Sequence, residues 1–262
     1  NQNSRGVDLT DYDLLKAHHL RYIPMTFELQ SQHAAEVWNK MIEDAEYLLF
    51  PLSDITQIRH FVKQNPTLQG FNITHPYKKE ILPFLDDIDD EAARVSAVNC
   101  VLVQRIGTKN LLKGYNTDVI GFAQTLAQLH LDTPTAALIL GTGGAAQAVA
   151  TALKKSGCSI TFVSRSKKSN TLTYESLTSE IIRQHPLIIN TTPLGMFPNN
   201  NKFPHIDYEN LTQNHTLIDL IYNPEETLFL KKGKAKGAQI CNGMTMLISQ
   251  AEASWKIWNN NF

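Results

Sequence analysis

The sequence has little cysteine and no pattern of metal ligands. Its three cysteines, Cys100, Cys158 and Cys241, are far apart and form no C-x-x-C pair. A sparse, odd set of cysteines is typical of reduced thiols in a cytosol-like compartment, rather than of a disulfide framework. The nine histidines are scattered without the spacing of metal ligands. We therefore predict a cytoplasmic protein that binds no metal.

An excess of charge of one sign is also missing, as are long apolar runs. The chain has 24 Lys and Arg against 25 Asp and Glu, which gives a net charge of −1. This balance favours neither nucleic acid as a partner nor disorder. No run approaches the ~18 apolar residues of a membrane span, and the N-terminus lacks a secretory pattern. The apolar share of 42% allows a sizeable core. The protein is expected to be a monomer or a homodimer.

Strand-like and helix-like segments alternate along most of the chain. This alternation predicts an α/β fold with a largely parallel sheet. The predicted strands are 45–50, 70–74, 98–104, 111–115, 136–140, 159–163, 187–189, 217–221 and 239–241. The predicted helices are 54–64, 89–94, 117–129, 143–155 and 244–258.

Two domains are expected from the order of these segments. Residues 119–243 have the order of a Rossmann-like, doubly wound nucleotide-binding domain. Residues 1–118 form a separate α/β unit, predicted to hold the substrate. The last helix, 244–262, is expected to return to this first domain, with Trp255 and Trp258 in packing roles.

A glycine-rich segment is the first functional motif. Gly141, Gly143, Gly144 and Ala145 follow a predicted strand and open a predicted helix. Glycines there permit a tight turn and let backbone N–H groups approach a pyrophosphate at the helix N-terminus. Many glycine strings are ordinary turns, but the order strand, loop and helix favours a dinucleotide site.

The end of the next strand indicates which dinucleotide binds. An NAD enzyme usually has Asp or Glu there, to hold the ribose 2′-hydroxyl. This chain instead has Ser164, Arg165, Ser166, Lys167 and Lys168. A guanidinium binds a 2′-phosphate through two hydrogen bonds. We therefore interpret this segment as the binding site for the 2′-phosphate of NADP. The alternative is a basic turn that is only solvated.

A polar segment near residue 75 carries candidate catalytic groups. Asn72 and Thr74 alternate by two along a short strand, so they share one of its faces. Pro76 is suited to begin a helix, which would put Lys78 in its first turn. The helix dipole would disfavour the lysine charge there, so we predict an acid/base with a lowered pKa. A surface lysine, like Lys79, is the alternative.

A second polar segment surrounds Asp118. Asn116 or Thr117 is expected to cap the helix that follows, and Asp118 lies in its first turn. A carboxylate is electrostatically favoured at that position. Asp118 is therefore either an ordinary helix-start residue or a member of a site.

Seven motifs in one order resemble the shikimate dehydrogenase family. They are N-I-T-x-P-x-K, A-V-N, G-x-N-T-D-x-x-G, G-x-G-G-x-x-x-A, N-x-T-P-x-G-M, D-x-x-Y-x-P and N-G-x-x-M-L-x-x-Q-A, between residues 45 and 254. The resemblance implies NADP-dependent, reversible reduction of 3-dehydroshikimate to shikimate, a step of chorismate and aromatic amino-acid biosynthesis. The alternatives are a dehydrogenase of a related cyclic acid such as quinate, or a catalytically impaired binding homologue.

The resemblance also implies roles for individual residues. Lys78 and Asp118 match the catalytic lysine and its partner carboxylate. The residues that match substrate contacts are Asn72, Thr74, Asn99, Tyr222 and Gln250. Those that match cofactor contacts are Gly141, Gly143, Gly144, Ala145, Ser164, Arg165, Thr191, Pro193, Leu220 and Gly243. The usual Asn of the family before the arginine is Ser164 here.

The first 43 residues depart from the family pattern. Family members usually begin with a strand, a glycine-rich turn and a Ser-x-Ser pair that binds the substrate carboxylate. Residues 1–43 contain one glycine, Gly6, and no such pair. Ser31 stands nearest to the second serine and is the candidate carboxylate ligand. Its alternative role is the N-cap of a helix over 33–43.

Overall fold

The computed structural model describes residues 52–74, 76–130 and 136–259. It divides the chain into two compact units, residues 1–117 with 251–262 and residues 118–250. Both crossings between the units fall within helices, α4 (Thr117–Gln128) and α8 (Met244–Trp258). The sequence put the corresponding boundaries at 118–119 and 243–244. Ser31 and the predicted strand 45–50 lie outside the described residues.

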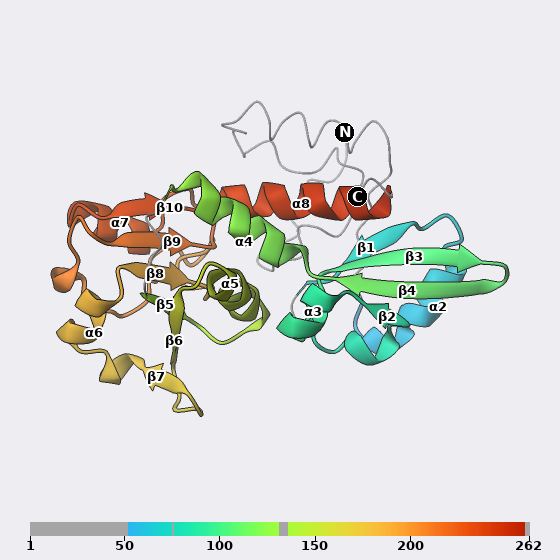
Figure 1. Cartoon of the computed structure of the whole chain (residues 1–262), viewed down its shortest axis with the longest axis horizontal. Coiled ribbons are helices and arrows are strands. Elements are labelled where there is room, and N and C mark those ends of the chain that lie inside the picture. The colour runs from blue at the N-terminus through green and yellow to red at the C-terminus, as the bar shows by residue number, and fades with distance from the viewer. Residues whose placement is uncertain (1–51, 75, 131–135, 260–262) are drawn as a thin grey trace. The chain divides into compact units, whose positions relative to one another are not determined.

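The second unit is built on a six-stranded parallel sheet (Figure 1). Its strand order is β10-β9-β8-β5-β6-β7, with all neighbours parallel. The strands are β5 (Ala136–Leu140), β6 (Ser159–Ser164), β7 (Thr171–Thr173), β8 (Leu187–Asn190), β9 (Thr216–Asp219) and β10 (Gln239–Cys241). Chain order reverses between β5 and β8, which is where doubly wound sheets bind ligands. The predicted Rossmann-like fold is confirmed.

The strands of this sheet are apolar because helices cover both faces. Figure 1 shows α5 (Gly144–Lys155) on one face, with α6 (Ser179–Gln184) and α7 (Leu228–Ala235) on the other. Leu138 and Leu140 of β5 join the core formed with α6 and α7. Successive side chains of a strand point to opposite faces, and all four residues 137–140 are buried.

The first unit has a mixed sheet, unlike the parallel sheet of the second unit. Its order is β1-β3-β4-β2, and only β2 and β4 are parallel. The strands are β1 (Gly70–Asn72), β2 (Asp87–Ile88), β3 (Cys100–Ile106) and β4 (Lys109–Tyr115). Two residues join β3 to β4, and Gly107 has a φ of 60°. A two-residue loop permits only antiparallel pairing.

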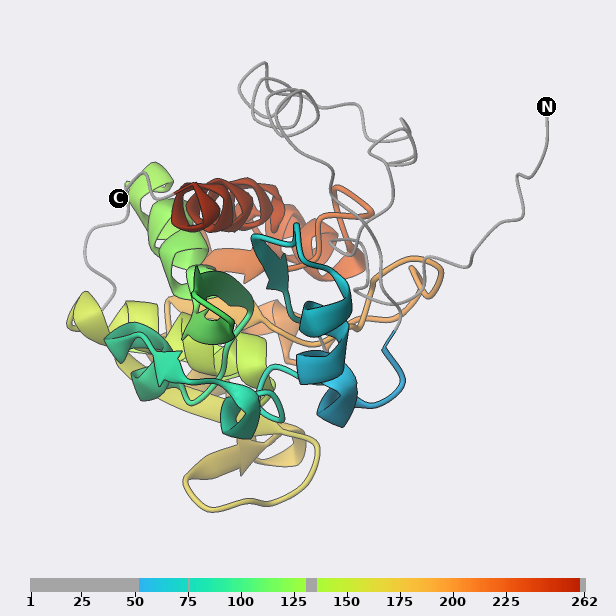
Figure 2. The same ribbon diagram turned by 90° about the vertical axis from the view of Figure 1, so that its right-hand side faces the viewer.

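Strand β3 divides the core of the first unit between the two faces of its sheet. Val101 and Val103 pack in the cluster that includes α2 (Ile58–Gln64), whereas Cys100 and Leu102 pack with Ile257 and Trp258 of α8. Figure 2 shows α2 in blue and α8 in red. The Trp258 indole donates to the Val101 carbonyl over 3.0 Å, which is a packing role.

Several elements differ from the sequence predictions. The helix expected at Pro76 is absent: residues 76–81 form turns, followed by a 3-10 helix, η4 (Leu82–Phe84). The Lys78 carbonyl accepts from Val98 N–H at 2.7 Å, and Pro83 cannot continue a helix. The strands β2 and β7 and the helices α6 and α7 were not predicted from the sequence. No described helix has both the length and the apolar character needed to cross a bilayer.

Candidate active site

A buried network of amides and hydroxyls joins the predicted substrate residues of the first unit. The Asn99 side chain donates to Thr117 Oγ1 over 3.0 Å and accepts from Thr117 N–H at 2.7 Å. Thr117 Oγ1 lies 3.1 Å from Ser254 Oγ, which donates to Asn72 Oδ1 over 3.3 Å. We call Asn72, Asn99, Thr117 and Ser254 the amide–hydroxyl network. It joins segments far apart in sequence, and neither Thr117 nor Ser254 exposes any surface.

Within this network, Asn99 also serves the start of helix α4. The sequence expected Asn116 or Thr117 to cap this helix. The Asn116 side-chain nitrogen donates to the Ala97 carbonyl, in the loop before β3, at 2.9 Å. The first helical N–H, of Thr117, is satisfied by Asn99 Oδ1. The position of the residue before Asp118 is therefore fixed by a side chain predicted to bind substrate.

Lys78 lies on a turn next to the amide–hydroxyl network of the first unit. Its carbonyl accepts from Val98 N–H, and Ile73 N–H donates to the Asn99 carbonyl at 2.8 Å. Lys78 is half-buried whereas Lys79 is exposed. This difference argues against the alternative that Lys78 is a surface lysine like Lys79. The helix-dipole argument for Lys78 is wrong, because no helix begins at Pro76. A role for this lysine depends on its place beside the amide–hydroxyl network.

Three other predicted site residues belong to the second unit. Asp118, its first residue, is 6% exposed. Gln250, its last residue, is buried and donates to the Leu247 carbonyl over 3.1 Å. Burial raises the pKa of Tyr222 to about 12, so the phenol keeps its proton at neutral pH and remains a hydrogen-bond donor.

The glycine-rich turn has the shape that a pyrophosphate site requires. Gly141 has a φ of 119°, and a Cβ there would lie 2.5 Å from Thr191 Oγ1. Gly143 precedes α5 without a side-chain cap, and a Cβ on it would meet no heavy atom within 4 Å. Together with Gly144 and Ala145 of the first helical turn, this leaves open space at the N-terminus of a 12-residue helix. A dinucleotide pyrophosphate fits there.

The basic turn after β6 lies next to that glycine-rich turn. Lys168 Nζ donates to Thr142 Oγ1 over 3.0 Å. Ser164 Oγ accepts from Ser166 N–H at 3.4 Å, a weak contact within the turn, and Arg165 is exposed. Burial raises the pKa of Tyr174 to about 12 although the nearby Arg165 charge opposes the shift. Cations that could bind a 2′-phosphate therefore lie beside the glycine-rich turn. The contact of Lys168 with this turn was not predicted from the sequence.

The remaining cofactor candidates gather at the carboxyl ends of β8 and β9. Thr191 donates from its backbone N–H and its hydroxyl to the Leu140 carbonyl, at 3.0 and 2.7 Å. Leu220 N–H donates to the Asn190 carbonyl at 3.0 Å. A Cβ on Gly243 would collide with the Leu220 carbonyl, so this close approach requires glycine. Pro193 lies on the same loop as Thr191.

A buried carboxylate at this edge was not assigned a role from sequence. Asp219, at the end of β9, is fully buried and bonded to Asn190 and Thr227. Burial raises its pKa to about 7. Asn190 opens the motif N-x-T-P-x-G-M, and Asp219 opens the motif D-x-x-Y-x-P. Their places in these two motifs are the sequence feature that could have identified them.

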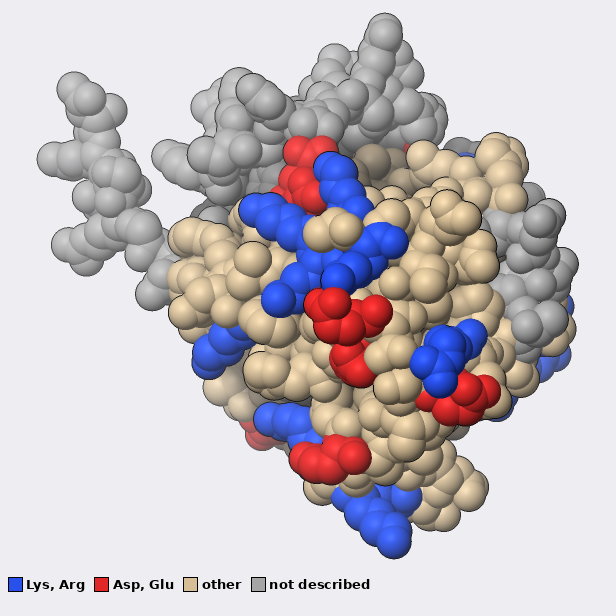
Figure 3. Space-filling view, turned by 90° about the vertical axis from the view of Figure 1, so that its left-hand side faces the viewer, with Lys and Arg blue, Asp and Glu red and all other residues tan. Residues whose placement is uncertain are grey.

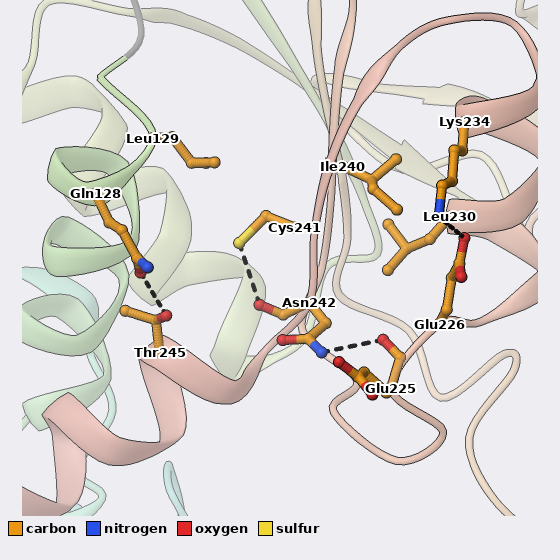
Figure 4. Close-up of a pocket in the computed structure, with 10 residues that line it drawn as sticks. All are labelled: Gln128, Leu129, Glu225, Glu226, Leu230, Lys234, Ile240, Cys241, Asn242 and Thr245. Carbon is orange, nitrogen blue, oxygen red and sulfur yellow. Dashed lines mark hydrogen bonds and ion pairs between the residues drawn. The ribbon is translucent and has the colours of Figure 1, made fainter. Parts of the chain in front are cut away.

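The second unit also has a hollow that contains none of the predicted site residues. Its volume is about 530 Å³, and it lies between the ends of α4 and β10 and the start of α7 (Figure 4). Figure 4 shows its walls tied together by Thr245 to Gln128, Asn242 to Glu225 and Lys234 to Glu226. No residue of the glycine-rich turn lines this hollow.

Lysines gather on the face drawn in Figure 3. Helix α7 and its C-cap contribute Lys231, Lys232, Lys234 and Lys236. Lys234 pairs with Glu226 and Lys236 with Glu209. Lys232 lies 4.6 Å from the centre of the Phe203 ring. Acidic and aromatic partners beside most of these lysines make this an ordinary charged surface. Among the described residues, no three His, Cys, Asp or Glu are arranged to hold a metal.

Comparison with known proteins identifies relatives for both units. The family model of the shikimate dehydrogenase substrate binding domain matches residues 24–101. Shikimate dehydrogenase (NADP(+)) of Staphylococcus haemolyticus is 37% identical over 228 residues, 83% of this chain and 82% of the relative. A chorismate mutase/shikimate 5-dehydrogenase fusion protein of Clostridium acetobutylicum superposes with a TM-score of 0.74 at 32% identity, covering 88% of this chain and 87% of that one. Shikimate 5-dehydrogenase of Thermus thermophilus, in complex with NADP(H) and shikimate, has a TM-score of 0.74 at 28% identity, covering 89% and 91%.

The parallel sheet, the glycine-rich turn and the basic turn define the class of this protein, an NADP-dependent oxidoreductase. The substrate unit and the extent of the identity narrow the class. The chain belongs to the shikimate dehydrogenase family. Its relatives are named for shikimate, so neither a quinate-type enzyme nor an impaired binding homologue is favoured.

Proposed function

We propose that Lys78 and Asp118 carry out the chemistry by which this chain reduces 3-dehydroshikimate to shikimate with NADPH, and the reverse. The observation that carries this assignment is the amide–hydroxyl network. Its member Asn99 accepts from Thr117 N–H, just before Asp118, through its side chain. The backbone of Asn99 accepts from Ile73 N–H, and its neighbour Val98 donates to the Lys78 carbonyl. Both residues thus have a backbone fixed by buried partners, as precise catalysis requires.

The proposed role of Lys78 is to donate a proton to the substrate oxygen. NADPH supplies the hydride that reduces the carbonyl carbon. The oxygen gains negative charge as the carbonyl is reduced, and a proton donor beside it lowers the barrier. In the reverse direction, Lys78 accepts the proton of the same hydroxyl. Asp118 is proposed to orient that hydroxyl by accepting its hydrogen bond.

The other polar candidates are proposed to bind the ring hydroxyls. They are Asn72, Thr74, Asn99, Tyr222 and Gln250. A polyol needs several convergent donors and acceptors, because each buried polar group left unpaired costs about 1–3 kcal/mol. Asn72 and Asn99 belong to one network, and Tyr222 keeps its phenolic proton. Ser31 remains the sequence candidate for the carboxylate, outside the described residues.

The proposed cofactor site runs along the carboxyl edge of the parallel sheet. Gly141, Gly143, Gly144 and Ala145 would hold the pyrophosphate. Arg165, on the turn shaped by Ser164, would bind the 2′-phosphate. Thr191, Pro193, Leu220 and Gly243 would line the nicotinamide end. The open space at Gly143 and the cations beside Thr142 support this assignment.

A spectrophotometric assay tests the proposed function directly. Purified chain is mixed with shikimate and NADP+, and formation of NADPH is followed by its absorbance. Shikimate is expected to be oxidised with a kcat/KM well above that for quinate, and NADP+ to be preferred over NAD+. Binding of shikimate without any turnover, by an intact fold, would contradict the enzymatic assignment.

We also propose that the protein works in the cytoplasm, as a monomer or a homodimer. All three cysteines are free thiols, two of them buried. Burial raises the pKa of Cys100 to about 12, which keeps it an unreactive thiol. Size-exclusion chromatography with light scattering distinguishes the two oligomeric states.

A further inference from the structure

Asp219 joins three segments of the second unit through its carboxylate. Oδ1 accepts from the Asn190 side chain at 3.0 Å and from Ile221 N–H at 3.1 Å. Oδ2 accepts from Thr227 Oγ1 at 2.6 Å. These partners lie at the end of β8, in the turn after β9 and at the N-cap of α7. One carboxylate therefore determines how three consecutive elements of the sheet edge meet.

Asn190 extends this control to the loop that follows β8. Its Oδ1 accepts from the N–H and the hydroxyl of Thr192, at 3.0 and 2.6 Å. Its backbone carbonyl accepts from Leu220 N–H. The amide of Asn190 thus faces Asp219 with its nitrogen and Thr192 with its oxygen. A change at Asp219 is transmitted to the loop through a single rigid side chain.

The loop controlled in this way touches the glycine-rich turn. Thr191 bonds twice to the Leu140 carbonyl, immediately before Gly141. Its hydroxyl occupies the space that a Cβ of Gly141 would fill. The chain of contacts from Asp219 through Asn190 to Thr191 therefore ends at the proposed pyrophosphate site. The turn after β9 carries Leu220, at the proposed nicotinamide end.

Within the part of the chain that the structure describes, no cation offsets the charge of Asp219. Its three partners are an amide, a backbone N–H and a hydroxyl, all uncharged. On η6 (Tyr208–Asn210), the nearby Tyr208 has its pKa raised, by burial first and by Asp219 second, so it stays protonated. Beside Thr227, Glu226 pairs with Lys234 at 3.2 Å. Burial raises the pKa of Asp219 to about 7 despite its hydrogen bonds, so both charge states occur near neutral pH.

We infer that Asp219 is a positioning residue for the cofactor, whose ionised carboxylate holds the loop 191–194 and the turn 220–222 in the arrangement that binds NADP(H). As an anion, Asp219 accepts all three hydrogen bonds, and such charge-assisted bonds are about twice as strong as neutral ones. When protonated, Oδ2 must donate, and the hydroxyl hydrogen of Thr227 has to turn away. The loops are then held less firmly. This inference rests on the proposed cofactor site.

The decisive experiment measures NADP(H) binding against pH in Asp219→Asn. An asparagine can still accept from Asn190 and Ile221 and can donate to Thr227, so it keeps the shape and reproduces the protonated form of Asp219. The KM for NADP+ and the Kd for NADPH are measured from pH 6 to pH 9. In the wild type both are expected to fall by about fivefold as pH rises through 7, at the lower end of typical coupling between two binding events. In Asp219→Asn they are expected to keep the weaker value throughout, with a smaller effect on kcat.

Two substitutions at Thr227 provide an independent test if Asp219→Asn folds poorly. Thr227→Val removes the donor to Oδ2, so ionisation becomes less favourable and the midpoint of the KM profile moves to higher pH. Thr227→Ser keeps the hydroxyl and restores the wild-type midpoint. A purely structural role for Thr227 would change the melting temperature without moving this midpoint.

The outcomes separate this inference from the proposed function. If the wild type binds NADPH but its pH profile is the same in Asp219→Asn, the inference is wrong and the cofactor site stands. If NADPH binds as expected but shikimate is not oxidised, the proposed reaction is wrong and the inference stands. A wild type that binds no NADP(H) overturns both.

Discussion

Both units contain a network of polar side chains, and the bonds described in the two units differ in kind. In the first unit, Asn72, Asn99, Thr117 and Ser254 are joined as amides and hydroxyls. In the second, Asn190 and Thr227 surround the carboxylate of Asp219. An uncharged network keeps its hydrogen bonds across the pH range, whereas a buried carboxylate exchanges acceptors for a donor when it protonates. The amide and hydroxyl bonds of the first unit therefore do not titrate, whereas the carboxylate of the second unit makes its network pH-dependent.

The largest effect is expected at Lys78, whose backbone carbonyl is bound by Val98, next to the network residue Asn99. Lys78→Ala removes the proposed proton donor, and kcat is expected to fall by about 10²–10⁴-fold with little change in KM for shikimate. Steady-state kinetics with saturating NADP+ measures the change. Lys79→Ala, at the exposed neighbour, is the control and is expected to keep wild-type kcat. An unchanged kcat in Lys78→Ala would remove this residue from the chemistry.

The next effect concerns stability at Asp219. Its pKa is about 7 in the folded protein against a usual 3.8, so the folded state keeps a proton that the unfolded chain releases. The anion binds its partners more strongly, but the cost of burying its charge is the larger effect. The stability from protonation is therefore complete below pH 4 and is lost as pH rises to 7 and above. The loss is on the order of 4 kcal/mol at most. Asp219→Asn cannot ionise and is expected to lack this decline.

Urea unfolding between pH 4 and pH 8 compares the two proteins. The difference in free energy of unfolding is expected to shift in favour of the variant as pH rises. Asp207→Asn, at an exposed carboxylate, controls for the loss of one charge. Parallel pH profiles for the wild type and Asp219→Asn would mean that Asp219 does not titrate in this range.

The reciprocal change would put a carboxylate into the amide–hydroxyl network. Asn99→Asp keeps the acceptor for Thr117 N–H, loses the donor to Thr117 Oγ1 and buries a group that can ionise. The variant is expected to be destabilised by about 2–4 kcal/mol at pH 8 and by less at pH 5. The same unfolding measurement applies, with the exposed Asn201→Asp as the matched control. Equal destabilisation at both pH values would show that the network is open to water.

The smallest effect is expected at an exposed charge. Arg165→Ala should weaken NADP(H) binding by about tenfold, because a charge-assisted contact to the 2′-phosphate is lost, while NAD(H) binding and stability stay near wild type. Titration of cofactor fluorescence measures both affinities, and Lys167→Ala is the neighbouring control. Equal losses for the two cofactors would contradict a 2′-phosphate contact.

The nucleotide-binding unit followed closely from its sequence. The apolar run 136–140, the glycines at 141–144 and the stop at Gly157, whose φ is 77°, are local signals that tertiary contacts reinforce. Helices α6 and α7 were missed because they are short, and α7 has a glycine in its interior. Gly233 is there because a Cβ would lie 2.5 Å from a Leu217 side-chain carbon, a contact no local pattern reveals.

The first unit was harder to predict for the same reason. A proline followed by lysines favours a helix at Pro76, but the Lys78 carbonyl is taken by Val98, which is 20 residues away. The network residue Ser254 gave no signal, since a serine on an amphipathic helix is usually exposed. Its bonds to Thr117 and Asn72 exist only because α8 packs against β3.

The sequence by itself determined the α/β class, the glycine-rich turn, the basic turn that indicates NADP, and the candidate residues Lys78 and Asp118. These depend on the order and spacing of residues within short segments. The tertiary structure decided which polar groups are buried and what they bond, and therefore that the pKa of Asp219 rises to about 7. Burial and hydrogen-bond partners arise where distant segments meet, so the pKa of a carboxylate is a property of the fold and cannot be read from its neighbours in sequence.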